Sequence, residues 1–134
     1  MNLVGLDLNS TRARAVHGSP NGVPMSLPLE DGRAELPLAL SLENKALEAG
    51  RAGCALCRQA PQLACLDFLK HLGDERTWQS QRNRLDANKA LTHVFDKLTS
   101  RFGRFQGVAS GIPTYLDENQ RHIVGQLAGK ARWK

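Results

Sequence analysis

The stretch NLVGLDLNSTRARAV, residues 2–16, decides how the fold begins. Residues 2–8 form an apolar run, and the cluster Asn9-Ser10-Thr11 that follows it is typical of a tight polar turn. Residues 12–16 then alternate polar and small apolar side chains, which is the pattern of a half-buried strand. The stretch therefore predicts a β-hairpin over 3–16, with a buried strand followed by an antiparallel return strand.

Residues 17–48 predict short strands and irregular segments. Glycine and proline interrupt residues 17–34 repeatedly, so only one short strand is expected there, around residues 25–29. Residues 36–42 read LPLALSL and alternate again. They predict one further strand, which Pro37 places at a sheet edge because proline cannot donate a ladder hydrogen bond.

A helical part is expected over residues 54–102. Residues 54–60 predict one or two helical turns, and residues 61–72 predict a second helix that Pro61 begins and Gly73 ends. Residues 74–84 have no periodicity and are expected to be a loop. Asp86 is expected to cap an amphipathic helix. The buried face of that helix is expected to hold Ala87, Ala90, Leu91, Val94, Phe95, Leu98 and Phe102.

A strand, a proline and a helix are expected over residues 107–131. Residues 107–112 predict a short buried strand that ends at Pro113. Asp117 and Gln120 have the spacing of a capping box, so a helix should follow. Its core face is expected to hold Ile123, Val124, Leu127, Ala128 and Ala131. The order of elements indicates an α/β fold, with helices packed on a mixed β-sheet.

Length and composition limit the function classes. The chain has 134 residues, the size of one domain, and no apolar run of about twenty residues that could cross a membrane. The amino terminus lacks a basic segment of the secretory type, and three cysteines favour a reduced compartment, so a cytoplasmic location is expected. Cys54 and Cys57 lack a second ligand pair for zinc, and burial as small apolar residues is expected for both.

Charge is distributed unevenly along the chain, whose net charge is +5. Residues 1–67 hold six basic and seven acidic residues, whereas residues 68–134 hold twelve and six. A basic half of this kind is compatible with a small nucleic-acid-binding protein. A solvated helical surface explains the same charge pattern. Of these two interpretations, binding to nucleic acid is the less favoured.

The turn after the first strand is the first candidate site. Asp7 ends a buried strand, where a carboxylate needs a positive or donating partner. A tight turn also presents successive backbone N–H groups, and the hydroxyls of Ser10 and Thr11 follow at once. Such a turn can hold phosphate while the carboxylate holds hydrated magnesium. An ordinary hairpin, in which Asp7 and Asn9 satisfy backbone groups of the turn, remains the alternative.

Residues 4–16 resemble the first phosphate-binding hairpin of the actin-like ATPases, and in particular that of the seventy-kilodalton heat-shock chaperones. The family pattern is apolar-Gly-Ile-Asp-Leu-Gly-Thr-Thr, and Asp7, Ser10 and Thr11 fit it. Asn9 stands where the family has glycine, and we expect it to take the left-handed backbone that asparagine tolerates. The resemblance implies that Asp7, Asn9, Ser10 and Thr11 bind phosphate, and that Asp7 holds Mg²⁺ through water.

A second stretch, GVASGIPTYLDENQR over residues 107–121, resembles the strand of the same family that ends in Val-Pro-Ala-Tyr-Phe and is followed by Asn/Asp-x-x-Gln-Arg. Pro113 and Arg121 match a proline and an arginine that relay the nucleotide state toward the substrate-binding half. Between the two stretches the likeness is loose. Residues 68–73, FLKHLG, are similar to the segment that carries the family's catalytic lysine, which makes Lys70 the catalytic candidate.

The resemblance implies a ribonuclease H-like subdomain of an actin-like ATPase, with a mixed sheet in the order 3-2-1-4-5 that stops before its fifth strand. It also implies ATP or ADP with Mg²⁺ as cofactor. Residues 1–134 cover only the first part of one nucleotide-binding lobe, so they are expected to bind ATP weakly and to hydrolyse it slowly or not at all. The alternative is a protein-interaction or self-association module that uses the exposed sheet edge.

Overall fold

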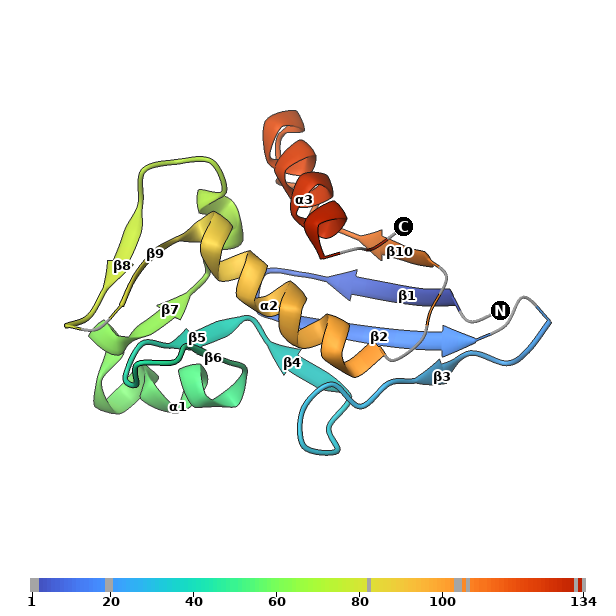
Figure 1. The fold of residues 1–134 in the computed structure, drawn as a ribbon, viewed down its shortest axis with the longest axis horizontal. Coiled ribbons are helices and arrows are strands. Elements are labelled where there is room, and N and C mark those ends of the chain that lie inside the picture. Colours follow the sequence, from blue (N-terminus) through green and yellow to red (C-terminus); the bar gives the residue numbers. More distant parts are fainter. Residues whose placement is uncertain are drawn as a thin grey trace.

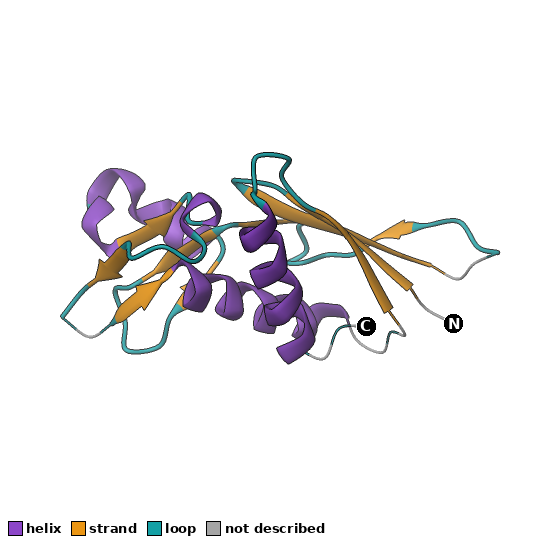
Figure 2. Ribbon diagram, turned by 90° about the horizontal axis from the view of Figure 1, so that it is seen from above, coloured by secondary structure: helices purple, strands orange, loops and turns teal. Residues whose placement is uncertain are grey.

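The computed structural model describes residues 3–18, 21–81, 83–102, 105, 107–131 and 133. It is a mixed α/β structure in which a five-stranded sheet lies at one end and two small sheets lie at the other (Figures 1 and 2). Three α-helices accompany the sheets in the described part of the chain. None of the helices described is long and apolar enough to cross a bilayer.

The five-stranded sheet begins with the predicted hairpin. β1 (Leu3–Leu8) and β2 (Arg12–Gly18) pair in antiparallel fashion. β3 (Met25–Ser26) and β4 (Glu35–Pro37) pair with different parts of β2, and β10 (Gly107–Gly111) runs parallel to β1. The strand order is thus β10–β1–β2–β3, with β4 also on β2. The predicted hairpin and the short strand near residue 25 are confirmed.

The second sheet is small and carries the first helix. β5 (Ala39–Ser41) pairs with both β6 (Glu48–Ala49) and β7 (Ala64–Leu66). Helix α1 (Arg51–Gln59) packs on β5 and β7. Gly53 allows this close packing, because a Cβ there would lie 2.7 Å from the backbone of both Ala39 and Leu40.

The expected strand over residues 36–42 is divided. Leu38 separates β4 from β5, and its N–H donates to the carbonyl of Thr11 at 2.9 Å. One half therefore joins the main sheet and the other half joins the small one. β4 pairs with β2 alone, so Pro37 does lie on an edge strand.

The prediction of one helix over residues 61–72 is wrong. Pro61 begins only a 3₁₀ turn, η1 (Pro61–Leu63), after which β7 is extended because it pairs with β5. A second 3₁₀ turn, η2 (Leu69–His71), follows. Of the apolar residues that suggested a helix, Phe68, Leu69 and Leu72 are buried, whereas Leu63 and Leu66 are half-buried. Gly73 still follows the last turn, with a positive φ of 82°.

The prediction of a loop over residues 74–84 is also wrong. β8 (Thr77–Gln79) and β9 (Arg84–Asp86) form a hairpin in which Trp78 lies opposite Leu85. Both of these side chains are buried. Strands of three residues are too short to show a period of two, so the sequence pattern did not reveal them.

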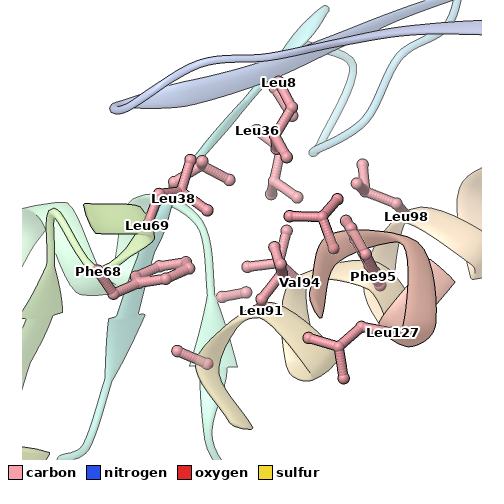
Figure 3. Packing of buried hydrophobic residues seen from close by; sticks show 14 of the residues in the cluster. Leu8, Leu36, Leu38, Phe68, Leu69, Leu91, Val94, Phe95, Leu98 and Leu127 are labelled. Carbon is pink, nitrogen blue, oxygen red and sulfur yellow. The ribbon is translucent and has the colours of Figure 1, made fainter. Parts of the chain in front are cut away.

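Helix α2 (Ala87–Phe102) carries the predicted core face, and all seven residues expected on that face are buried. Asp86 Oδ1 accepts a hydrogen bond from the N–H of Lys89 at 2.8 Å, so the expected cap is present. Figure 3 shows Leu91, Val94 and Leu98 of this helix facing Leu8 and Leu36 of the main sheet. Because α2 also contacts β6 and β9, it joins the two ends of the molecule.

Helix α3 (Glu118–Lys130) begins with the predicted capping box. Gln120 N–H donates to Asp117 Oδ1 at 2.8 Å, and Asp117 N–H donates to Gln120 Oε1 at 3.1 Å. Val124 and Leu127 are buried, and the rest of the expected core face is half-buried. β10, however, was expected to be buried, and its last three residues are exposed because it is the outermost strand of its sheet.

Candidate phosphate-binding turn

Asn9 organises the turn between β1 and β2. Its Oδ1 accepts hydrogen bonds from the N–H groups of Thr11 and Arg12, each at 3.0 Å, and from the hydroxyl of Thr11 at 3.3 Å. Its own N–H donates to the carbonyl of Arg12 at 3.0 Å. The expectation of a left-handed backbone at Asn9 is wrong, since the positive-φ residues other than glycine in the described segments are Asp31 and Asp67.

These hydrogen bonds determine what the turn can bind. The N–H groups of Thr11 and Arg12 are the donors that a bound phosphate oxygen would need. In this structure the amide oxygen of Asn9 already occupies them. A phosphate must therefore displace the Asn9 side chain before the turn can bind it, which weakens binding.

Asp7 and Ser10 lie beside the segment that follows β10. Asp7 is exposed and stands opposite Gly111 in the parallel register of β1 and β10. A Cβ at Gly111 would lie 4.0 Å from Asp7 Oδ1, which is ordinary van der Waals contact. Ser10 Oγ lies 2.9 Å from the hydroxyl oxygen of Tyr115. The structure thus brings together the two stretches that carry the family resemblance.

Asp7 is the one carboxylate in the turn itself. Among the described residues, no group of three or more His, Cys, Asp or Glu side chains could hold a metal ion. A single carboxylate suits Mg²⁺ that keeps most of its water and is shared with phosphate oxygens. Asp7 has the chemistry for that indirect contact.

Lys70 reaches this region through its backbone. Gln120 Nε2 donates to the carbonyl of Lys70 at 2.9 Å, which ties η2 to the start of α3. The exposed ammonium of Lys70 pairs instead with Asp67, at 2.9 Å. The side chain of Lys70 is therefore engaged within its own segment, and the structure does not direct it at the turn.

Pro113 and Arg121 flank the same segment. Pro113 accepts a hydrogen bond from the N–H of Leu116 at 3.3 Å, in the connection between β10 and α3. Arg121 lies on the first turns of α3 and lines a groove of about 360 Å³ between that helix and β10. The resemblance assigns Pro113 and Arg121 to the relay. In the sequence, Pro113 precedes Tyr115 and Arg121 follows it.

A buried ion-pair cluster escaped the sequence analysis. Glu30 is 6% exposed, and its Oε2 accepts a hydrogen bond from Lys97 Nζ at 2.9 Å. Its Oε1 accepts from the N–H of Arg51 at 2.9 Å, so Glu30 caps helix α1 from twenty-one residues upstream. This cap explains why α1 begins at Arg51, three residues before the predicted start. Gly50 has no Cβ, and one there would lie 1.9 Å from Glu30 Oε2.

The electrostatics of this cluster follow from its burial. Burial by itself raises the pKa of Glu30, but the hydrogen bonds from Lys97 and the Arg51 backbone outweigh it and hold the pKa below its usual range. Lys97 also donates to the carbonyl of Ala49 at 2.6 Å. A cavity of about 430 Å³ adjoins the pair. No local sequence motif marked Glu30, because its partners are distant in sequence.

The predicted burial of the two cysteines on α1 is wrong. Cys54 and Cys57 were expected to be buried, but both are exposed on α1, whereas Cys65 is buried. Burial raises the pKa of the Cys65 thiol to about 12. The pKa of Cys54 is also raised, by partial burial and by the charges of Cys57 and Glu30. A raised pKa reduces the thiolate fraction, so Cys54 lacks the activation that redox-active cysteines have.

The comparisons with known proteins add no relative to this description. Neither a scan against protein-family models nor a search of curated protein sequences returns a match for this chain.

Proposed function

We propose that residues 1–134 form the first part of a nucleotide-binding lobe of the actin-like ATPase type, similar to that of the seventy-kilodalton heat-shock chaperones. In this proposal the turn of Asp7, Asn9, Ser10 and Thr11 contacts the phosphates of ATP or ADP. Asp7 contacts hydrated Mg²⁺. Binding is weak and these residues alone do not hydrolyse ATP at a useful rate.

The strand arrangement supports the proposal. The family resemblance implies a sheet in which the third, second, first and fourth strands are neighbours in that order. The order β3–β2–β1–β10 has this form, with β1 antiparallel to β2 and parallel to β10. Ligands of open α/β sheets bind outside the carboxyl ends of the strands, which is where the turn of Asn9 lies.

The contact between Ser10 and Tyr115 is the observation that carries the proposal. Each residue belongs to one of the two stretches that resemble the family, and their hydroxyl oxygens are 2.9 Å apart. Parallel pairing of β1 and β10 brings the two segments to one edge of the sheet, so both can contribute to one site.

The same geometry explains why weak binding is proposed. The Asn9 amide must give up three donors before phosphate can take their place. Catalysis by this class also needs charges that converge on the transferred phosphate from both sides of a closed cleft. Lys70, the catalytic candidate, pairs with Asp67, so its contribution in this lobe requires that ion pair to open.

The proposal is tested by titrating the isotopically labelled chain with MgATP and MgADP in an NMR experiment. We expect saturable shifts of the amides of residues 7–12, with a dissociation constant of about 1 mM or weaker, on the order of −4 kcal/mol. MgCl₂ alone and sodium triphosphate serve as controls for the metal and for the phosphates.

Two variants sharpen this test. Asp7→Asn should weaken MgATP binding, while Asp31→Asn, which changes an exposed acid on another turn, should leave it unchanged. The proposal fails if 10 mM MgATP, about ten times the expected constant, leaves the amides of residues 7–12 unmoved. It also fails if both aspartate variants respond to MgATP as the parent chain does.

A further inference from the structure

Helix α1 carries two exposed cysteines that the proposed nucleotide site does not use. Cys54 and Cys57 both lie on the surface of this helix, whereas Cys65 is buried in the core. The helix packs on the small sheet of β5, β6 and β7, whereas the candidate turn belongs to the five-stranded sheet (Figure 1). The two cysteines are therefore a separate candidate for chemistry.

The two thiols share one face of the helix. α1 is helical over Arg51–Gln59, so a spacing of three residues places the Cβ atoms of Cys54 and Cys57 on neighbouring turns, about 5–6 Å apart. The charge of Cys57 contributes to the raised pKa of Cys54, as expected for thiols that lie near each other. Both sulfurs can therefore reach one small ion from the same side of the helix.

The separation of the two Cβ atoms is too large for a relaxed disulfide. A disulfide holds its Cβ atoms about 3.5–4.5 Å apart, so α1 would have to distort to form one. An ion between the sulfurs removes this mismatch, because two metal–sulfur bonds of about 2.3 Å allow the sulfurs to lie up to about 4.6 Å apart. The undistorted helix therefore fits an ion that bridges the thiolates better than it fits a direct sulfur–sulfur bond.

The number of ligands selects the ion. Within the part of the chain that the structure describes, no further His, Cys, Asp or Glu joins the pair to make a group of three that could hold a metal ion. Zinc takes four ligands in structural sites and three protein ligands in catalytic sites, so two thiolates leave it short. Cu(I) is a soft ion that thiolates select, and it accepts two ligands in a linear arrangement.

We propose that Cys54 and Cys57 together bind one Cu(I) ion in a two-coordinate site on the surface of α1. Each thiol releases its proton to solvent and forms one sulfur–copper bond, and neither copper nor sulfur changes its oxidation state. The resulting complex of one Cu(I) and two thiolates carries a single negative charge. Arg58 follows Cys54 by four residues on the same helix, and its guanidinium offsets part of this charge.

The test titrates the fully reduced chain with tetrakis(acetonitrile)copper(I) under nitrogen and follows the ultraviolet absorption of the copper–thiolate bonds. We expect this absorption to saturate at one Cu(I) per chain, with two protons released for each ion bound. The loaded chain should remain a monomer in sedimentation velocity. Saturation at one ion for every two chains, together with a dimer, would overturn a site that lies within one helix.

Serine variants test whether both cysteines are ligands. Cys54→Ser and Cys57→Ser should each lose Cu(I) to the chelator bicinchoninate at a concentration at which the parent chain keeps it. Cys65→Ala should retain Cu(I) as the parent does, because Cys65 is buried away from the pair. A parent chain that loses Cu(I) as readily as either serine variant would overturn the proposal.

A matched variant separates the helical spacing from the mere presence of two thiols. Cys57→Ser combined with Gln59→Cys keeps two exposed cysteines on α1, but they are then five residues apart. Five residues correspond to about 7.5 Å along the helix axis and to different faces of the helix, which one ion cannot bridge. This variant should lose Cu(I) as the single variants do. Retention equal to that of the parent would overturn the role of the spacing.

Zinc and glutathione disulfide test the two alternative uses of the pair. An excess of Zn²⁺ should leave the copper–thiolate absorption unchanged, since two thiolates do not complete a zinc site. Glutathione disulfide should not produce a bond between Cys54 and Cys57 in peptide mass mapping, because α1 holds their Cβ atoms too far apart. Displacement of Cu(I) by Zn²⁺, or ready formation of that disulfide, would overturn the assignment of the pair to Cu(I).

Discussion

The hydroxyl oxygens of Ser10 and Tyr115 lie 2.9 Å apart, although 105 residues separate them along the chain. The contact joins the turn after β1 to the connection that follows β10. Parallel pairing of these two strands brings both of their carboxyl ends to one edge of the sheet, with Asp7 opposite Gly111. The candidate site is therefore a consequence of strand direction as much as of the turn sequence.

The coupling between these two residues can be measured with a double-mutant cycle. Ser10→Ala and Tyr115→Phe each remove one hydroxyl of an exposed pair. Each single change should therefore lower the free energy of unfolding by only about 0.5 kcal/mol. The double variant should lose no more than one single variant does. Urea denaturation gives the free energies.

Ser100→Ala is the control for this cycle, because Ser100 donates within its own helix to the carbonyl of Lys97. Its effect should add to that of Tyr115→Phe. Additivity of Ser10→Ala with Tyr115→Phe would contradict the contact.

Asn9→Gly should strengthen the binding of MgATP. The substitution removes the amide oxygen that occupies the N–H groups of Thr11 and Arg12, so both donors become free for phosphate. Each freed donor to a charged oxygen favours binding by roughly 1 kcal/mol, and for the two donors together we expect an affinity about thirtyfold higher. NMR titration of residues 7–12 measures the change.

A glycine also loosens a turn, so a second variant is needed as a control for Asn9→Gly. Asn21→Gly makes the same exchange at an exposed position of another turn and should leave the affinity as it is. Weaker nucleotide binding by Asn9→Gly would mean that the asparagine supports the site instead of obstructing it.

Glu30→Gln should destabilise the protein and reduce the loss of its free energy of unfolding as the pH falls. The pKa of Glu30 is lowered, so its carboxylate stabilises the fold fully above the ordinary value of 4.5 and less as pH falls through the folded value. Glutamine leaves Lys97 without its anion, which should cost about 3 kcal/mol at pH 7. Urea denaturation between pH 7 and about pH 3 measures both effects.

The variant should still lose some stability in acid. Hydrogen bonds from Arg14 and from the Arg76 backbone lower the pKa values of Glu35 and Asp74, and these two carboxyls remain. Glu43→Gln, at an exposed position, should leave the pH dependence almost unchanged. An acid response of Glu30→Gln equal to that of the parent would contradict the buried pair.

Two glycines inside helices should respond to alanine with opposite signs. Gly125→Ala on α3 should stabilise by about 1 kcal/mol, because no atom lies within 4 Å of the new Cβ and alanine favours the helix. Gly53→Ala on α1 should destabilise by about 1–3 kcal/mol, because its Cβ would press on the backbone of Ala39 and Leu40. Thermal unfolding compares the pair, and changes of the same sign would be inconsistent with the packing of α1 on β5.

Elements with a strong local pattern were predicted well from the sequence. The seven apolar positions of α2 repeat at helical spacing, and all of them are buried. The capping box at Asp117 and the hairpin of β1 and β2 likewise depend on residues that are close in the chain. In each case, the residues that interact to form the element lie within the same short stretch of sequence that predicts it.

The short elements between β4 and α2 could not be predicted in this way. β7 is a strand because it pairs with β5, with Cys65 opposite Leu40. The helical spacing of Leu63, Leu66 and Leu69 is a coincidence. β8 and β9 each have three residues, which is too few to establish alternation. Long-range pairing overrode the local preference in both segments.

By itself, the sequence determined the first hairpin, the core face of α2, the cap of α3 and the residue types of the candidate turn. Only the tertiary structure decided that Ser10 meets Tyr115 and that Glu30 caps α1. The physical reason is the number of residues along the chain over which each kind of interaction acts. Helix periodicity and capping act over three or four residues, whereas strand pairing and buried ion pairs depend on how distant segments pack.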